Sequence, residues 1–99
     1  EESILPNLVE LDPDFFEAKA FPNPTTSDAT LALEILQSAQ FDIVLYDMSG
    51  RMVQSIYSGF LDEGRQNFQI ELAEQHSGMY IVKVVSNEQN ESLKIQKLN

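Results

Sequence analysis

The chain has 99 residues, of which 42% are hydrophobic and 22% are charged, a composition that suits one globular domain. Its 16 acidic residues against 6 basic ones give a formal net charge of -10, so electrostatic repulsion argues against a nucleic acid as partner. The absence of cysteine excludes a disulfide framework, a thiolate zinc site and a cysteine nucleophile.

Residues 1–19 differ from the rest of the chain and are predicted to form a linker from an upstream cargo domain. The segment is acidic, its only basic residue is Lys19, and Pro6 and Pro13 limit the length of any helix. We expect proteases to cut this linker before they cut the strands. Because the chain opens on Glu1 and not on methionine, we expect it to be a fragment or a processed product, with any export signal upstream.

The apolar residues of this segment favour a second interpretation. They are Leu8, Val9, Leu11, Phe15 and Phe16. Such side chains are suited to dock on the folded domain or on a second copy of it, because docking removes apolar surface from water. The second case would make the protein a homodimer through its N-terminal segment.

From Ala20 onward, short runs of alternating apolar and polar residues are separated by turn residues, which predicts β-strands with one wet face. Two more continuously apolar runs, Phe41–Tyr46 and Tyr80–Val85, predict central strands. The expected strands are Ala18–Phe21, Thr30–Leu36, Phe41–Asp47, Met52–Tyr57, Arg65–Leu72, Met79–Ser86 and Ser92–Leu98. We therefore expect residues 20–99 to form an all-β, antiparallel immunoglobulin-like β-sandwich of about seven strands.

The turns between these runs have a recognisable chemistry. In the run from Asp47 to Gly50, aspartate is suited to cap a type I turn and glycine to adopt a positive φ. Arg51 is expected to pair with a carboxylate or with carbonyl groups across this turn. The runs 61–64 and 75–78 also end in glycine after polar residues, and they predict further turns.

No residue pattern in the chain supports catalysis, a metal site or a cofactor. His76 is the only histidine and stands in a predicted turn, where an exposed loop side chain is the simplest interpretation. Asp12 and Asp14 lack the following glycine of a calcium loop, and no glycine-rich phosphate loop is present. We expect no catalytic residue, no metal ligand and no cofactor, and hence not an enzyme.

The segment Phe21-Pro22-Asn23-Pro24-Thr25 is unusual. Each proline lacks a backbone N–H and holds φ near about -65°, so a stiff, extended approach to the next strand is predicted. Such a segment is expected not to pair fully with a neighbouring strand. Two interpretations remain open: protection of a sheet edge, or a recognition element.

Together, four segments resemble the C-terminal sorting domain of the type IX secretion system of Bacteroidetes. They are Phe21–Thr25, Val44–Arg51, Ser77–Val84 and the region of Lys94, and the resemblance covers residues 20–99. It implies that a recognition motif includes Pro22, Asn23, Pro24, Asp47, Gly50, Arg51, Gly78, Tyr80 and Lys94.

The resemblance also implies a function and partners. A member of this family passes through the periplasm, is recognised by an outer-membrane translocon that includes a β-barrel shuttle, and brings its cargo to the cell surface or outside. A sortase-like peptidase cuts the linker and joins the cargo to the surface. The alternative is an accessory sandwich of a secreted hydrolase, of the carbohydrate-binding or fibronectin-like kind. A sugar platform needs exposed aromatic residues, but the chain has no Trp, and Tyr46, Tyr57 and Tyr80 stand in strand patterns that favour burial.

The last strand is expected to form a sheet edge whose backbone groups are open to strand addition by a receptor. Alternation predicts that its apolar residues, like those of the preceding strand, face the core: Tyr80, Val82, Leu93 and Ile95. Lys94 and Lys97 are expected to be exposed, either as receptor contacts or as charges that keep the edge from pairing.

Overall fold

The computed structural model describes residues 15–87 and 89–99. The described part contains seven β-strands: β1 (Phe16–Phe21), β2 (Ala29–Ile35), β3 (Ala39–Asp47), β4 (Met52–Leu61), β5 (Gly64–Ile70), β6 (Gly78–Ser86) and β7 (Gln89–Lys97). Within these residues no helix has the length and apolar character needed to cross a membrane.

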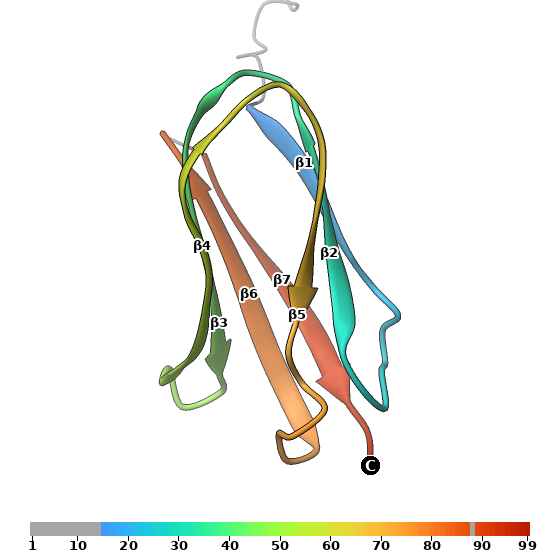
Figure 1. The fold of residues 1–99 in the computed structure, drawn as a ribbon. Helices are drawn as coiled ribbons and strands as arrows, with labels where there is room; N and C mark the ends of the chain where they lie inside the picture. Colours follow the sequence, from blue (N-terminus) through green and yellow to red (C-terminus); the bar gives the residue numbers. More distant parts are fainter. Residues whose placement is uncertain (1–14, 88) are drawn as a thin grey trace, which may run out of the picture.

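The strands form two antiparallel sheets that face each other, so the predicted all-β sandwich is confirmed. One sheet has the order β1-β2-β5 and the other the order β4-β3-β6-β7 (Figure 1). Because successive strands run in opposite directions, the β1–β2, β3–β4 and β5–β6 connections lie at the same end as the last residues of β7 (Figure 1). We call this the carboxyl-terminal end of the sandwich.

Alternation along the strands places the core between the sheets, as expected for a sandwich. In β2 the side chains of Leu31, Leu33 and Ile35 are buried, whereas the residues between them are half-buried. The central strands of the other sheet contribute Phe41, Ile43, Leu45, Val82 and Val84, none of which is exposed to solvent. The predicted orientation of the last two strands is confirmed too, because Tyr80, Val82 and Ile95 are buried and Leu93 packs against the core.

The first strand begins earlier than predicted, at Phe16 instead of Ala18. Phe16 is only 1% exposed and its ring meets that of Phe41 edge-on, with ring centres 5.5 Å apart. The apolar side chain that was assigned to the linker is thus a core residue, since β1 pairs with β2 from Phe16 onward. Residues 1–14, which hold most of the predicted linker, lie outside the described residues, so the linker boundary, its cleavage and the homodimer remain predictions.

Three other strands are longer than expected by two residues or more. β3 begins at Ala39 instead of Phe41. β4 continues past Tyr57 to Leu61 because Ala39–Asp42 of β3 provide a pairing partner for residues 58–61. Register shifts between Ile43 and Val44 and between Leu45 and Tyr46 mark bulges in this pair, and they lie within the part of β4 that was predicted. β7 begins at Gln89, three residues before the predicted start at Ser92.

Candidate functional site

The residues of the predicted motif gather at the carboxyl-terminal end of the sandwich. Pro22, Asn23 and Pro24 lie in the β1–β2 connection, and Asp47, Gly50 and Arg51 form the β3–β4 turn (Figure 1). Gly78 is the first residue of β6, Tyr80 is the third, and Lys94 lies in the second half of β7. The antiparallel topology alone brings together segments that are far apart in the sequence. Two polar networks, one around Asp47 and one around Asn23, connect them to their neighbours.

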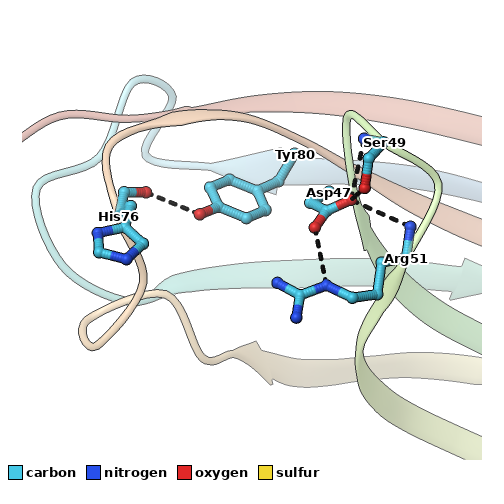
Figure 2. A network of polar contacts seen from close by, with 5 residues as sticks. All are labelled: Asp47, Ser49, Arg51, His76 and Tyr80. Carbon is cyan, nitrogen blue, oxygen red and sulfur yellow. Dashed lines mark hydrogen bonds and ion pairs between the residues drawn. The ribbon is translucent and has the colours of Figure 1, made fainter.

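Asp47 organises the β3–β4 turn through both of its carboxylate oxygens (Figure 2). Its Oδ1 accepts hydrogen bonds from the Ser49 hydroxyl at 2.7 Å, from the Ser49 N–H at 2.9 Å and from the Arg51 N–H at 3.0 Å. Its Oδ2 accepts from Arg51 Nε at 3.1 Å, which completes an ion pair. The predicted cap and the predicted arginine pair are therefore both confirmed.

These donors favour the charged form of the carboxylate. The Ser49 hydroxyl first, and then the Arg51 N–H, lower the pKa of Asp47 from 3.8 to about 2. The carboxylate thus remains an acceptor throughout the physiological pH range. The turn is held by a charge that acid removes only under extreme conditions.

We expect the stabilising effect of Asp47 to depend on pH in a defined window. Because folding lowers the pKa of its carboxyl group, the contribution is complete above the ordinary value of 3.8 and is lost as the pH falls through about 2. Asp47→Asn should therefore lower the midpoint of urea unfolding at neutral pH, and the difference from wild type should shrink toward pH 2. A carboxyl NMR titration of Asp47 centred near 3.8 would contradict this expectation.

Gly50 adopts the predicted positive φ, with a value of +89°, and its N–H donates to the Asp47 carbonyl at 3.0 Å. Apart from Gly50 itself and its two chain neighbours, no atom lies within 4 Å of the position that a Cβ would take, so a substitution is limited by backbone strain and not by space. This is a position where only glycine, or more weakly asparagine, is readily accommodated.

Gly50→Val should lower the free energy of unfolding by about 1–3 kcal/mol, because a β-branched side chain is strained at positive φ. Gly50→Asn is the matched control and should cost less, since asparagine tolerates the left-handed region. Urea denaturation of the two variants gives the comparison. Equal stability of the valine variant and wild type would argue against a rigid turn in solution.

The side chains of Tyr80 and Lys97 donate hydrogen bonds to the backbone of the β5–β6 connection. The Tyr80 ring is buried, and its hydroxyl donates to the carbonyl of His76 at 2.7 Å (Figure 2). The Lys97 ammonium donates to the neighbouring carbonyl of Gln75 at 2.9 Å. The His76 side chain is exposed, as predicted.

The predicted exposure of Lys97 is wrong, since this side chain is only 5% exposed. The reason is the period of two along β7: Ile95 faces the core, so Lys97 points to the same side. Its apolar stem lies at the end of the core while the ammonium group finds a carbonyl at the rim. Lys94, on the opposite face, is exposed as predicted.

The β1–β2 connection lies along the outer edge of β7. Asn23 Nδ2 donates to the Lys94 carbonyl, and the Gln96 N–H donates to Asn23 Oδ1, both at 2.9 Å. The next residue pair continues the contact, because the Thr25 N–H donates to the Gln96 carbonyl at 2.8 Å and the Leu98 N–H to the Thr25 carbonyl at 2.7 Å. One side-chain amide and one backbone unit thus cover the edge of β7 from Lys94 to Leu98.

This contact corrects two expectations. The proline segment is bent and crosses to β7, where the Asn23 amide supplies a donor and an acceptor to the backbone edge. The edge of β7 is not open to strand addition between Lys94 and Leu98, since its backbone groups there are already bonded. Of the two interpretations left open, the geometry supports protection of a sheet edge; a recognition role stays a prediction.

Comparison with known proteins shows which family has this arrangement of motifs. The family model described as the secretion system C-terminal sorting domain matches residues 19–97. The chain belongs to this family. It is a C-terminal sorting signal for type IX secretion, and the family consists of sorting signals, not of catalytic domains. A search of curated proteins found no significant match.

Sequence reasoning missed a polar link that joins two loops of the sorting domain. Asp28 Oδ1 accepts from the N–H groups of Leu72 at 3.0 Å and Ala73 at 2.9 Å, and its other oxygen accepts from the Gln69 amide. The Ala73 N–H, followed by the Gln69 amide, lowers the pKa of Asp28. An aspartate just before a strand is a familiar capping residue, but no local signal identifies a partner more than forty residues away.

Two glutamine side chains join the sheets of the sorting domain along their seams, and the sequence pattern did not indicate either. Gln89 Oε1 accepts from the Phe15 N–H at 2.7 Å, and its Nε2 donates to the Phe16 carbonyl at 3.0 Å, which links β7 to the start of β1. On the other side, Gln54 Oε1 accepts from the Glu71 N–H at 2.9 Å. Strands of different sheets do not pair through their backbones, so each amide satisfies backbone groups at a border between the sheets.

Two features of the described part of the sorting domain bear on an enzyme or a sugar platform: whether a group of side chains could hold a metal ion, and whether the tyrosines form an exposed row. Among residues 15–87 and 89–99 no group of three or more His, Asp or Glu side chains could hold a metal ion. Tyr80 is buried, and Tyr46 and Tyr57 are half-buried. Tyr57 packs against Phe68 and donates its hydroxyl to the Phe60 carbonyl at 2.9 Å. These tyrosines do not form the exposed aromatic row that the alternative function requires.

Proposed function

We propose that the sorting domain directs its cargo across the outer membrane as a folded surface that the translocon and its β-barrel shuttle recognise. The proposal includes transit through the periplasm before the cargo reaches the cell surface or the medium. The observation that carries it is the gathering of the motif residues at the carboxyl-terminal end of a sandwich that belongs to the sorting family.

The polar networks support recognition of a fixed shape. The carboxylate of Asp47 holds the β3–β4 turn, and Tyr80 anchors the loop that precedes β6. Asn23 binds the backbone of β7 on both sides of Ile95. A receptor that meets such a surface need not order it first, which reduces the entropic cost of binding.

Processing of the linker forms the second half of the proposal. We infer that a sortase-like peptidase cuts within residues 1–19 and joins the cargo to the cell surface. The acidic, proline-containing composition of that segment supports access by a protease. We also keep the homodimer through the N-terminal segment as a proposal, on the basis of its apolar residues.

The test is to fuse all 99 residues to the C-terminus of a fluorescent reporter that carries a periplasmic export signal. In a host with a working type IX system, we expect the reporter at the cell surface or in the medium. In the same host without the translocon, it should remain in the periplasm. Retention of the reporter in both hosts would overturn the proposal, and release in both would show export by another route.

A further inference from the structure

The two outer faces of the sandwich differ in chemistry. On the sheet β1-β2-β5, the outward residues are mostly polar or charged: Glu17, Lys19, Thr30, Glu34, Arg65, Asn67 and Gln69. Arg65 and Glu34 form an exposed ion pair across β5 and β2, with Nε and Oε1 at 2.9 Å. This is the ordinary wet face of a sandwich.

The outer face of the sheet β4-β3-β6-β7 is apolar near the carboxyl-terminal end. The register places Met52, Tyr46 and Ile81 side by side on three neighbouring strands, and Lys94 beside Ile81 on the fourth. Met79 lies one step further toward that end, opposite Gln96. We call Met52, Tyr46, Ile81 and Met79 the apolar stripe.

The stripe is open to solvent although its residues are large and apolar. Met52 is 59% exposed and Met79 is 36% exposed, while Tyr46 and Ile81 are half-buried. Contiguous apolar side chains at a protein surface are typical of interaction sites. Methionine suits such a site because its flexible side chain adapts to a partner.

Two lysines flank the stripe and give this face a local positive charge. Lys94 pairs with Ile81, and Lys83 pairs with Ser92, so the two lysines are diagonal neighbours on the same face of β6 and β7. Both are exposed. The acidic residue of this face is Asp42, whose carboxylate accepts a hydrogen bond from the Ser58 hydroxyl at 2.7 Å. The face is thus basic on a chain whose net charge is -10.

We propose that the apolar stripe, together with Lys83 and Lys94, is the docking surface for a protein of the secretion machinery that presents an apolar patch rimmed by carboxylates. This inference rests on the proposed function. Charge complementarity identifies the partner: two exposed cations beside apolar side chains match carboxylates beside an apolar patch. An extended anionic membrane would repel the acidic remainder of a chain with net charge -10, whereas a protein patch has to match this face alone. A second copy docked by the same face would bring the lysines of both copies together, so like charges oppose a dimer through this surface.

The polar networks fix both ends of this surface. Tyr46 precedes Asp47, whose carboxylate bonds the N–H of Arg51 next to Met52. At the other end, Asn23 holds the carbonyl of Lys94. A partner therefore meets an ordered row of side chains at the end of the sandwich where the motif residues gather.

The experiment uses two matched charge reversals in the reporter fusion. Lys83→Glu with Lys94→Glu changes the proposed surface, and Lys19→Glu with Arg65→Glu changes the net charge by the same amount on the opposite sheet. We expect surface delivery to fall by about tenfold or more in the first variant and to stay near wild type in the control. Circular dichroism and size exclusion on the purified chain check that both variants remain folded.

A second variant tests the apolar part without changing the charge. Met52→Ser with Met79→Ser should also reduce delivery, because it removes contact area from exposed side chains that the core does not need. Normal delivery by both this variant and the Lys83, Lys94 variant would overturn the docking surface. Delivery by the wild-type fusion in that same experiment would leave the proposed function intact, whereas its failure would overturn both.

Two further outcomes would assign this surface to a different kind of partner. Binding of the purified chain to vesicles of phosphatidylglycerol and phosphatidylethanolamine, lost in the Lys83, Lys94 variant, would assign the surface to a membrane. A wild-type dimer that the Met52, Met79 variant converts to a monomer would assign it to a second copy. Either result overturns the proposed protein partner.

Discussion

Phe16→Ala should lower the free energy of unfolding by about 3–5 kcal/mol, the usual cost of removing a buried phenylalanine side chain. The Phe16 side chain is 1% exposed and packs edge-on against Phe41 between the two sheets. Its loss removes apolar area from the core and leaves a cavity that rigid neighbouring strands fill only in part. A cost of this size would show that the folded domain begins before Ala18, inside the segment that was predicted to be a linker.

Phe21→Ala is the matched control, because it removes the same side chain from the same strand at a position that is 46% exposed. It should cost no more than about 1 kcal/mol, as expected for a partly exposed side chain. Urea denaturation at neutral pH measures both variants. If Phe16→Ala cost as little as Phe21→Ala, the strand β1 would be detached in solution and the boundary at residue 19 would hold.

Lys97→Glu should destabilise the domain by about 3 kcal/mol, because it replaces a buried donor with a buried carboxylate that faces a carbonyl. The ammonium of Lys97 donates to the Gln75 carbonyl at 2.9 Å, and the side chain is 5% exposed. Reversing the charge leaves the Gln75 carbonyl without its donor. It also places a negative charge near Asp28, whose charged form is stabilised by Lys97 in the wild-type domain. The β5–β6 connection should loosen as well.

Two controls separate charge from position. Lys94→Glu makes the same change on the exposed face of the same strand and should alter the free energy of unfolding by less than about 0.5 kcal/mol. Lys97→Met keeps the apolar stem and should cost less than Lys97→Glu, since only the hydrogen bond is lost. Equal denaturation midpoints for Lys97→Glu and Lys94→Glu would show that Lys97 is exposed in solution. If Lys97→Glu is destabilised as expected, an export defect of this variant reports unfolding and not lost recognition.

Local chemistry was predictable along the chain. Asp47 and Gly50 are three residues apart, so the capping carboxylate and the positive φ of the turn follow from the residues that form it. Alternation in β2, β6 and β7 likewise identified the apolar side chains that reach the core, including Tyr80 and Ile95, but the inward direction of Lys97 was missed. The resemblance to the sorting family depended on these same local motifs.

The boundaries of pairing were less predictable, because a strand ends where its neighbour ends. β4 extends to Leu61 since β3 offers a partner there, and β1 begins at Phe16 since β2 continues to Ile35. The change in composition near residue 20 indicates neither the start of β1 nor the end of β4. Phe16 is apolar in an acidic segment, and only the position of β2 shows that it is a core residue.

The sequence by itself determined the fold class, the turn at Asp47 and the family, because each depends on residues within a few positions of one another or on their order along the chain. The tertiary structure alone decided three contacts: Asn23 with the edge of β7, Asp28 with Ala73, and Lys97 with Gln75. It also decided that Met52, Tyr46, Ile81 and Lys94 form one row. These contacts join residues that only strand order and register bring together, and neither quantity is encoded in a local pattern.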